Sequence, residues 1–108
     1  MKRGEIWTVT GSGYAQKPRP AIIIQSEQIT RDFDSVVIIG LTSNQNSTTP
    51  IRVPIMPDTS NGLKALSYAM TEKPLTVKKT DLGKLVGHIT QLQLRDIERS
   101  LLIVLGIN

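Results

Sequence analysis

The chain has 108 residues, a length that provides one domain, residues 1–108, with a core of its own. It has no cysteine and one histidine, His88, which excludes disulfide and cysteine–zinc scaffolds, so we expect no metal, no cofactor and a reducing cytoplasm. Lys and Arg number 13 against 9 Asp and Glu, and this net charge of +4 suits an anionic partner such as nucleic acid. No apolar run approaches the roughly 20 residues of a membrane span, and the basic N-terminus lacks the apolar segment of a signal peptide.

Short strands dominate the first half of the predicted fold. Residues 5–10 alternate and are rich in Ile, Val and Thr, which predicts a strand. Residues 21–26 and 35–43 are near-continuous apolar runs, which predict buried strands. Between them, residues 27–35 are polar and charged and predict a loop, and turn formers at 44–50 predict a second loop.

The second half adds edge strands and one helix. Residues 51–57 alternate but contain prolines, which places them at a sheet edge, and further strands are expected around 66–71 and 74–77. Residues 90–105 show helical spacing, preceded by a capping box and followed by a glycine stop. Five or six short strands with one C-terminal helix predict a mainly β fold, a small antiparallel barrel closed by the helix. The apolar face of the helix is expected to contain Leu94, Ile97, Leu101, Val104 and Leu105.

The stretch GYAQKPRPAIII, residues 13–24, contains the first candidate for a functional site. Pro18 and Pro20 hold Arg19 in a stiff, extended backbone at the entrance to a buried strand. An arginine is always protonated and presents five donors in a planar fork, which suits a phosphate. Lys17 precedes Arg19 by two residues and points to the same side if the chain stays extended. The alternative is an ordinary strand entry with a solvated arginine.

Three other positions carry groups that suit phosphate chemistry or RNA. Thr42 and Ser43 end an apolar strand, where their hydroxyls can donate to a phosphate oxygen or cap the turn. Glu72 beside Lys73 can act as a base, orient a cation, or form a solvated strand edge. Tyr14 in the glycine-rich loop can stack on a base or merely close the loop. From the residues alone, these alternatives stay open.

In combination and in this order, these segments resemble the MazF/PemK family of toxin endoribonucleases. The resemblance spans nearly the whole chain and includes the PRP strand entry, the Thr-Ser strand end and a Gly-Lys-x-x-Gly pattern at 83–87. It implies a small SH3-like barrel that assembles as a homodimer. It also implies a type II toxin–antitoxin system, in which the toxin cleaves single-stranded mRNA at specific sequences without a metal. A cognate antitoxin protein would neutralise it.

The resemblance also implies roles for individual residues. The family's catalytic arginine falls on Arg19 and its catalytic threonine on Thr42. The acidic positioning residue of some members falls on Glu72, where aspartate is commoner, and Lys17 is basic in the branch that carries KPRP. Tyr14 stands where better-studied members have a glutamate, which is a departure from the family pattern. A second departure is the absence of an arginine just before the acidic residue.

RNA carries its own nucleophile, the 2′-hydroxyl, so the enzyme needs to align it, move two protons and stabilise charge on the phosphate. Arg19 is suited to stabilise the charge on the phosphate, and the hydroxyls of Thr42 and Ser43 can donate to a non-bridging phosphate oxygen. The expected products are a 2′,3′-cyclic phosphate and a 5′-hydroxyl. The alternative function is a non-catalytic member that binds a protein or nucleic acid, as CcdB-like gyrase inhibitors do. Candidates for the general base are Lys17, Glu72 and Tyr14.

Overall fold

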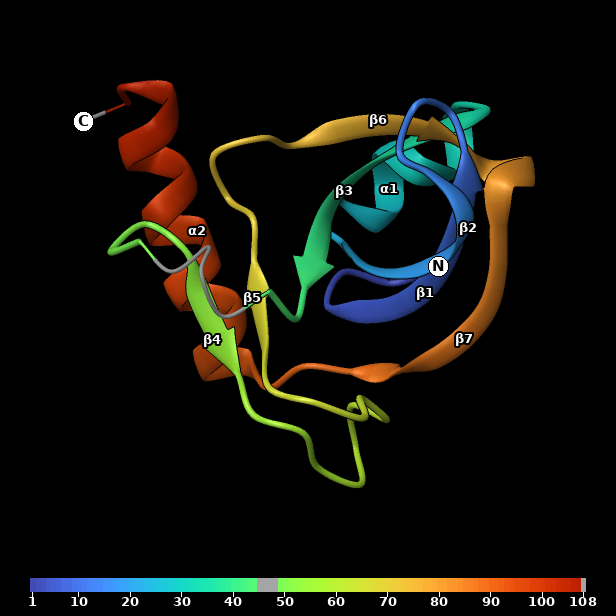
Figure 1. Cartoon of the computed structure of the whole chain (residues 1–108). Helices are drawn as coiled ribbons and strands as arrows, with labels where there is room; N and C mark the ends of the chain where they lie inside the picture. The colour runs from blue at the N-terminus through green and yellow to red at the C-terminus, as the bar shows by residue number, and fades with distance from the viewer. Residues whose placement is uncertain (45–48, 108) are drawn as a thin grey trace.

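One curled antiparallel sheet and a C-terminal helix make up the fold, which confirms the predicted mainly β class (Figure 1). The computed structural model describes residues 1–44 and 49–107, so residues 45–48 of the predicted 44–50 loop lie outside it. Over these residues the strand order is β4-β5-β3-β2-β1-β7, and β6 pairs with β3. The strands are β1 (Glu5–Gly11), β2 (Ala15–Ile23), β3 (Ser35–Thr42), β4 (Val53–Ile55), β5 (Ser67–Ala69), β6 (Leu75–Lys78) and β7 (Leu82–His88). The helices are α1 (Glu27–Asp32), the short 3₁₀ helix η2 (Lys79–Asp81) and α2 (Gln91–Leu105).

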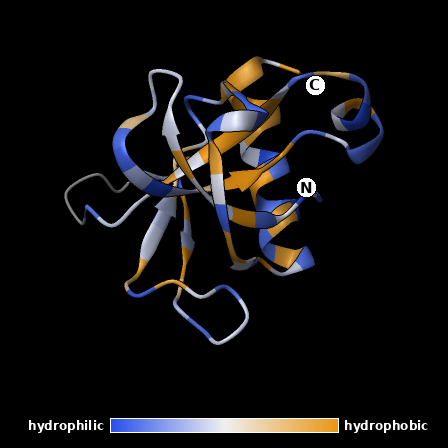
Figure 2. Cartoon of the chain, turned by 90° about the vertical axis from the view of Figure 1, so that its right-hand side faces the viewer, coloured by the Kyte–Doolittle hydropathy of each residue, from blue (hydrophilic) through white to orange (hydrophobic). Residues whose placement is uncertain are grey.

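The last three residues of β2, 21–23, and most of β3 are buried on both faces, which explains why these segments read as continuous apolar runs. Successive residues of β2 enter different clusters: Ile22 packs toward α2, whereas Ala21 and Ile23 pack on the opposite face. Figure 2 shows the apolar segments gathered in the middle of the molecule beside α2, with hydrophilic loops around them. The cluster under α2 consists of Ile6, Ile22, Ile39, Leu41, Val53, Ile55, Ala69, Ile89, Leu94 and Ile97.

Helix α2 has the predicted ends, but its apolar face is covered along only part of its length. Thr90 Oγ1 accepts from Gln93 N at 3.1 Å and Gln93 Oε1 accepts from Thr90 N at 2.9 Å, which confirms the capping box. Gly106 ends the helix in the left-handed conformation. Leu105, predicted to be covered, is 60% exposed, because the helix extends past β4, the strand it packs on (Figure 1). No helix in the described part of the chain has the length and apolarity to cross a bilayer.

Residues 27–35 were predicted as a loop, and this prediction is wrong because helix α1 forms there. Ser26 caps the helix by accepting from Ile29 N at 3.3 Å, and Thr30 is buried against the sheet. Six residues make fewer than two turns, too few to produce a helical apolar pattern. The cap was the one local signal of this helix.

Strand β7 was not predicted, and it raises the strand count over the described residues to seven. Its sequence contains two glycines and two charged or polar residues, which weakens the strand pattern. The glycines allow close packing: a Cβ on Gly83 would lie 2.5 Å from Thr8 Oγ1, and one on Gly87 would lie 2.3 Å from Ser60 O. The Gly-Lys-x-x-Gly pattern therefore reflects two close approaches to β7, one by the Thr8 hydroxyl and one by the Ser60 carbonyl.

The loop after β4 closes the barrel, because β4 and β7 are the two ends of the strand order. His88 N donates to Ser60 O at 3.0 Å, and Gly62 N donates to Asp58 O at 3.2 Å. Asn61 is buried, and both polar atoms of its side-chain amide are hydrogen-bonded. Nδ2 donates to Met56 O at 2.7 Å, and Oδ1 accepts from Leu63 N at 3.0 Å. The loop is thus fixed against β7, and it forms one wall of the site described next.

Candidate active site

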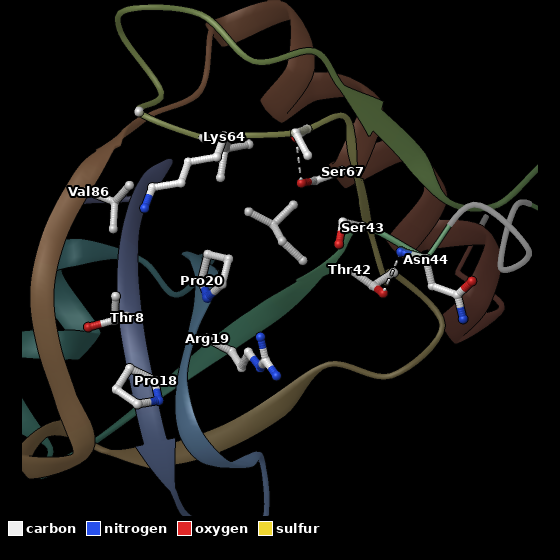
Figure 3. Close-up of a pocket in the computed structure, with 14 residues that line it drawn as sticks. Thr8, Pro18, Arg19, Pro20, Thr42, Ser43, Asn44, Lys64, Ser67 and Val86 are labelled. Atoms are coloured by element: carbon white, nitrogen blue, oxygen red, sulfur yellow. Dashed lines mark hydrogen bonds between the residues drawn. The ribbon is translucent and has the colours of Figure 1, made fainter.

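A pocket opens where strands β2 and β3 separate. The β2–β3 pairing ends at Ala21 and Gly40, and beyond this point β3 pairs with β5 instead. A pocket of about 760 Å³ lies in the gap, and Figure 3 shows the side chains around it. Its lining comes from Pro18, Arg19 and Pro20 of β2; Leu41, Thr42, Ser43 and Asn44 at the end of β3; Gly62, Leu63, Lys64 and Ala65 of the closing loop; and Thr8, Ser67 and Val86.

Arg19 lies on β2 and lines this pocket, but it is not at the strand entrance that the sequence predicted: β2 begins at Ala15 and ends at Ile23 rather than spanning 21–26, because residues 15–19 pair with β1. Its side chain extends toward the end of β3, where Thr42 lies (Figure 3). It is exposed and makes no hydrogen bond or ion pair with any residue of 1–44 or 49–107. The flanking prolines lie where β2 has left β3, so their missing N–H groups remove no hydrogen bond from the β2–β3 ladder. The guanidinium keeps its five donors available for a ligand.

 Thr42 and Ser43 lie in the same pocket as Arg19 although they are far from it in the sequence, because the pairing of β3 first with β2 and then with β5 brings them there. Asn44 N donates to Thr42 Oγ1 at 3.2 Å, so this hydroxyl caps the turn, as one of the two interpretations predicted. A hydroxyl that accepts one bond still has its own proton to donate. Thr42 can therefore cap the turn and donate to a ligand oxygen in the pocket at the same time.

Lys64 stands on the closing loop and was not singled out from the sequence. It lines the pocket together with Arg19, is exposed, and makes no hydrogen bond or ion pair within the described residues (Figure 3). The only signal in the sequence was its place two residues after Gly62 in the Asn61-Gly62 pair. No carboxylate occurs among the described lining residues, so two cations face the pocket without a charge to balance them. This arrangement suits an anion.

Lys17 does not join the pocket. The β1–β2 register passes from Val9 opposite Arg19 to Gly11 opposite Ala15, so three residues of β2 face one residue of β1. This bulge breaks the regular alternation on which the predicted same-side placement of Lys17 and Arg19 depended. Lys17 is exposed and is not among the lining residues.

Glu72 and Lys73 also lie outside the pocket. Arg52 holds Glu72 in a two-pronged ion pair, in which Nε donates to Oε1 at 3.1 Å and Nη2 lies 2.5 Å from Oε2. The Arg52 hydrogen bonds lower the pKa of Glu72 below its ordinary value. Lys73 lines a separate pocket of about 270 Å³ together with Tyr14. The structure therefore gives Glu72 a structural partner that the sequence did not indicate.

Tyr14 lies behind the pocket rather than in it. Its phenol O–H donates to Pro20 O at 2.7 Å. Burial raises the pKa of Tyr14, although a hydrogen bond from the Leu41 backbone and the charge of Arg19 act in the opposite direction. The phenol is thus protonated and occupied by backbone groups, which favours the loop-closing interpretation over stacking on an RNA base and over a role as general base. Among the described residues, no three His, Asp or Glu side chains gather where they could share a metal ion.

Comparison with known protein families identifies the group to which this fold and pocket belong. A sequence profile of the PemK-like, MazF-like toxins of type II toxin–antitoxin systems matches residues 2–105. The chain belongs to this toxin family. The assignment confirms the MazF/PemK resemblance drawn from the sequence. One MazF relative, described as a probable endoribonuclease MazF from Mycolicibacterium smegmatis, is 33% identical over 108 residues, 99% of this chain and 98% of the relative.

Solved structures of MazF-type proteins share the fold over the full chain. A mycobacterial endoribonuclease in complex with its cognate antitoxin has a TM-score of 0.83 and 25% identity, covering 100% of this chain and 97% of that one. A MazF from Deinococcus radiodurans has a TM-score of 0.80 at 14% identity, covering 98% of this chain and 96% of that one. At such low identity the second structure supports the fold alone.

Proposed function

We propose that this MazF-family toxin is an endoribonuclease that cleaves single-stranded RNA at specific sequences, with the phosphate bound in the pocket between β2 and β3. The observation that carries the proposal is the guanidinium of Arg19, which has no hydrogen-bond or ion-pair partner among residues 1–44 and 49–107 and faces the hydroxyl-bearing end of β3 in a pocket whose described lining contains no carboxylate. The 33% identical relative described as a probable endoribonuclease supports the same activity. A phosphodiester group matches this site in charge and in its need for several donors.

In the proposed reaction, the 2′-oxygen of the RNA attacks the adjacent phosphorus while the bond to the 5′-oxygen breaks. Arg19 stabilises the charge that develops on the phosphate oxygens. The Thr42 hydroxyl donates a hydrogen bond to a non-bridging oxygen, with Ser43 beside it. One proton leaves the 2′-hydroxyl and one joins the leaving 5′-oxygen. The products are a 2′,3′-cyclic phosphate and a 5′-hydroxyl, and the reaction needs no metal.

Lys64 holds a neighbouring phosphate or the same phosphate from the opposite wall. Its loop is fixed to β7 by the Ser60–His88 hydrogen bond and by the buried Asn61, so the cation stands on a rigid support. Single-stranded RNA binds through its backbone charge, and each phosphate contact adds affinity that falls with salt.

The partners follow from the family and from the surface. We propose an acidic antitoxin that covers the basic pocket, as expected for a toxin of net charge +4; a mycobacterial relative has been solved with its cognate antitoxin. We also propose a homodimer, supported by the exposed apolar side chains Leu102, Ile103 and Leu105 in the last turns of α2. We propose that residues 1–108 act as one domain. We also propose that the protein acts in the cytoplasm, where the mRNA is found and where a chain without cysteine has no disulfide to be reduced.

A second candidate function is binding without cleavage. Tyr14 and Glu72, two of the three candidates for the general base, are engaged by other groups of the protein, and Lys17 lies outside the pocket. A site that binds phosphate but lacks a base would hold RNA and leave it intact.

Mapping the ends of cleaved RNA distinguishes the two functions. A long RNA of low structure is incubated with the protein in EDTA, with Arg19→Ala purified in parallel. Discrete cuts with cyclic-phosphate ends, lost in the variant, are the expected result. A folded wild-type protein that binds the RNA and leaves it intact would overturn the nuclease proposal in favour of binding.

A further inference from the structure

The phenol of Tyr14 lies between β2 and β3 at the position where the next backbone pair of their ladder would form. The ladder of backbone pairs ends at Ala21 and Gly40, so the next pair in the same register would be Pro20 with Leu41. Tyr14 Oη donates to Pro20 O at 2.7 Å, and the Leu41 backbone hydrogen-bonds the phenol. One side-chain hydroxyl thus joins the two strands at the point where they part.

A hydroxyl is suited to this position because it both donates and accepts. If the strands remained paired, Pro20 O and the Leu41 N–H would bond each other directly, and the pocket would narrow. If they parted without a bridge, each of these backbone groups would lose its partner, which is costly in a partly buried place. The phenol satisfies both groups at a wider separation than a direct backbone hydrogen bond allows.

The surroundings of the ring are built to hold it. A Cβ on Gly40 would lie 2.6 Å from Tyr14 Cε1 and 2.7 Å from Tyr14 Oη, so only glycine leaves room for the ring there. Met70 Cε approaches the same point of Gly40 at 2.8 Å. The residue at the base of the gap is therefore a glycine because the tyrosine packs over it.

The bridge adjoins both residues proposed to act on the phosphate. Pro20 follows Arg19 directly, and Leu41 precedes Thr42 directly. We propose that Tyr14 is a positioning residue that sets the separation between Arg19 and Thr42 by holding β2 and β3 apart at a fixed distance. This role rests on the proposed function for its catalytic consequence, but the bridge itself can be tested without any cleavage.

Tyr14→Phe removes the hydroxyl and keeps the ring. We expect the single-turnover cleavage rate at saturating enzyme to fall about 10-fold or more, since misplacing a reacting group by about 1 Å costs up to about 10²-fold. The Kd for an RNA made uncleavable by 2′-deoxy substitution should stay within about twofold. Wild-type cleavage by a folded Tyr14→Phe protein would overturn the positioning role.

Ser12→Ala is the matched control, since it also removes a bridging hydroxyl from the β1–β2 hairpin. Ser12 Oγ donates to Asp81 Oδ2 and accepts from Lys78 N at 3.2 Å, and none of these three residues lines the pocket. It should lower the melting temperature as Tyr14→Phe does and leave the cleavage rate unchanged. An equal loss of rate in both variants would mean that Tyr14 acts through general stability, which contradicts the proposal.

Amide hydrogen exchange tests the bridge independently of activity. In Tyr14→Phe, protection of the Leu41 amide should fall about 10-fold or more, while that of Ile39 in the intact ladder should not change. Gly40→Ala, which displaces the ring, should reproduce the loss at Leu41. Unchanged protection at Leu41 in Tyr14→Phe would overturn the bridge. If Tyr14→Phe loses protection at Leu41 but the wild-type protein cuts no RNA, the proposed function is refuted and the bridge is confirmed.

Discussion

Arg19 within β2 and Arg52 just before β4 have opposite surroundings in this chain. Arg52 is largely covered and is held by the carboxylate of Glu72 through two parallel contacts. Arg19 is exposed, faces a pocket without a carboxylate, and makes no hydrogen bond or ion pair within residues 1–44 and 49–107. One cation is neutralised inside the fold, and the other is left for a ligand.

The difference shows that a guanidinium alone does not mark a phosphate site. Both arginines are next to prolines or strand ends in the sequence, and both have the same donors. What separates them is whether the fold supplies an anion, because an ion pair within the protein removes the charge that would attract RNA. A functional arginine is recognised by its missing partner.

The largest expected effect comes from truncating the free arginine. Arg19→Ala should lower the single-turnover cleavage rate by about 10²–10³-fold, the range for loss of one donor to a developing negative charge. Its melting temperature should stay close to that of the wild type, because the side chain is exposed and makes no contact of this kind in the described fold.

Arg52→Ala is the matched control for the paired arginine, and the comparison predicts the opposite result. Truncating a hydrogen bond to a charged group costs about 1–3 kcal/mol, and each kcal/mol shifts the melting temperature of a domain of this size by about 4–8 °C. The cleavage rate at a temperature where the variant is folded should change little. A stable Arg52→Ala that loses cleavage as Arg19→Ala does would break the distinction between the two arginines.

The hydroxyl facing Arg19 should matter next. Thr42→Val keeps the shape of the side chain and removes its donor, and we expect a loss of about 10²-fold in cleavage rate, the lower end of the range for one donor. Thr42→Ser restores the hydroxyl and should recover most of the rate. If Thr42→Ser were as impaired as Thr42→Val, the methyl group rather than the hydroxyl would be the important part.

Lys64 is expected to affect binding more than chemistry. Lys64→Gln should weaken binding of uncleavable single-stranded RNA and reduce the slope of log K against log salt by about 0.7, the value for one phosphate contact. Lys2→Gln makes the same charge change beside α1, away from the pocket. Equal slopes for the two variants would show that Lys64 contributes only net charge.

The smallest effect concerns the stability that the paired arginine provides. Arg52 lowers the pKa of Glu72 in the folded state, so the pair stabilises the fold fully above the unfolded pKa of about 4.3 and loses this contribution as the pH falls through the folded value. Wild type should melt above Glu72→Gln at pH 7, and the two curves should converge in acid. A difference that persists unchanged at low pH would contradict this assignment.

The sequence predicted the class of the fold well, because burial and capping are local signals. The apolar runs at 21–26 and 35–43 identified strands that are buried on both faces, and the Thr90–Gln93 box identified the start of α2. Helix α1 and strand β7 were not predicted, since α1 is too short to show a helical period and β7 contains two glycines that allow close contact with residues distant in the sequence.

For the candidate site, too, residues marked by local sequence were predicted, and residues that depend on distant contacts were not. Arg19, Thr42 and Ser43 were chosen for their places at strand ends, and strand pairing brings them into one pocket. Lys17 was misplaced by a bulge, and Glu72 was found with Arg52, because neither a register shift nor an ion pair across 20 residues leaves a trace in local spacing. Lys64 was missed because its importance depends on how the closing loop docks on β7.

The central claim is that the pocket aligns an RNA whose own 2′-hydroxyl is the nucleophile, with Arg19 stabilising the phosphate. The most direct measurement replaces the 2′-hydroxyl by hydrogen at the mapped cleavage position of a short RNA. We predict that this single change abolishes cleavage while wild-type protein still binds the RNA. Cleavage that persists on the substituted RNA would mean that water or a side chain attacks the phosphorus, and the account given for this pocket would be wrong.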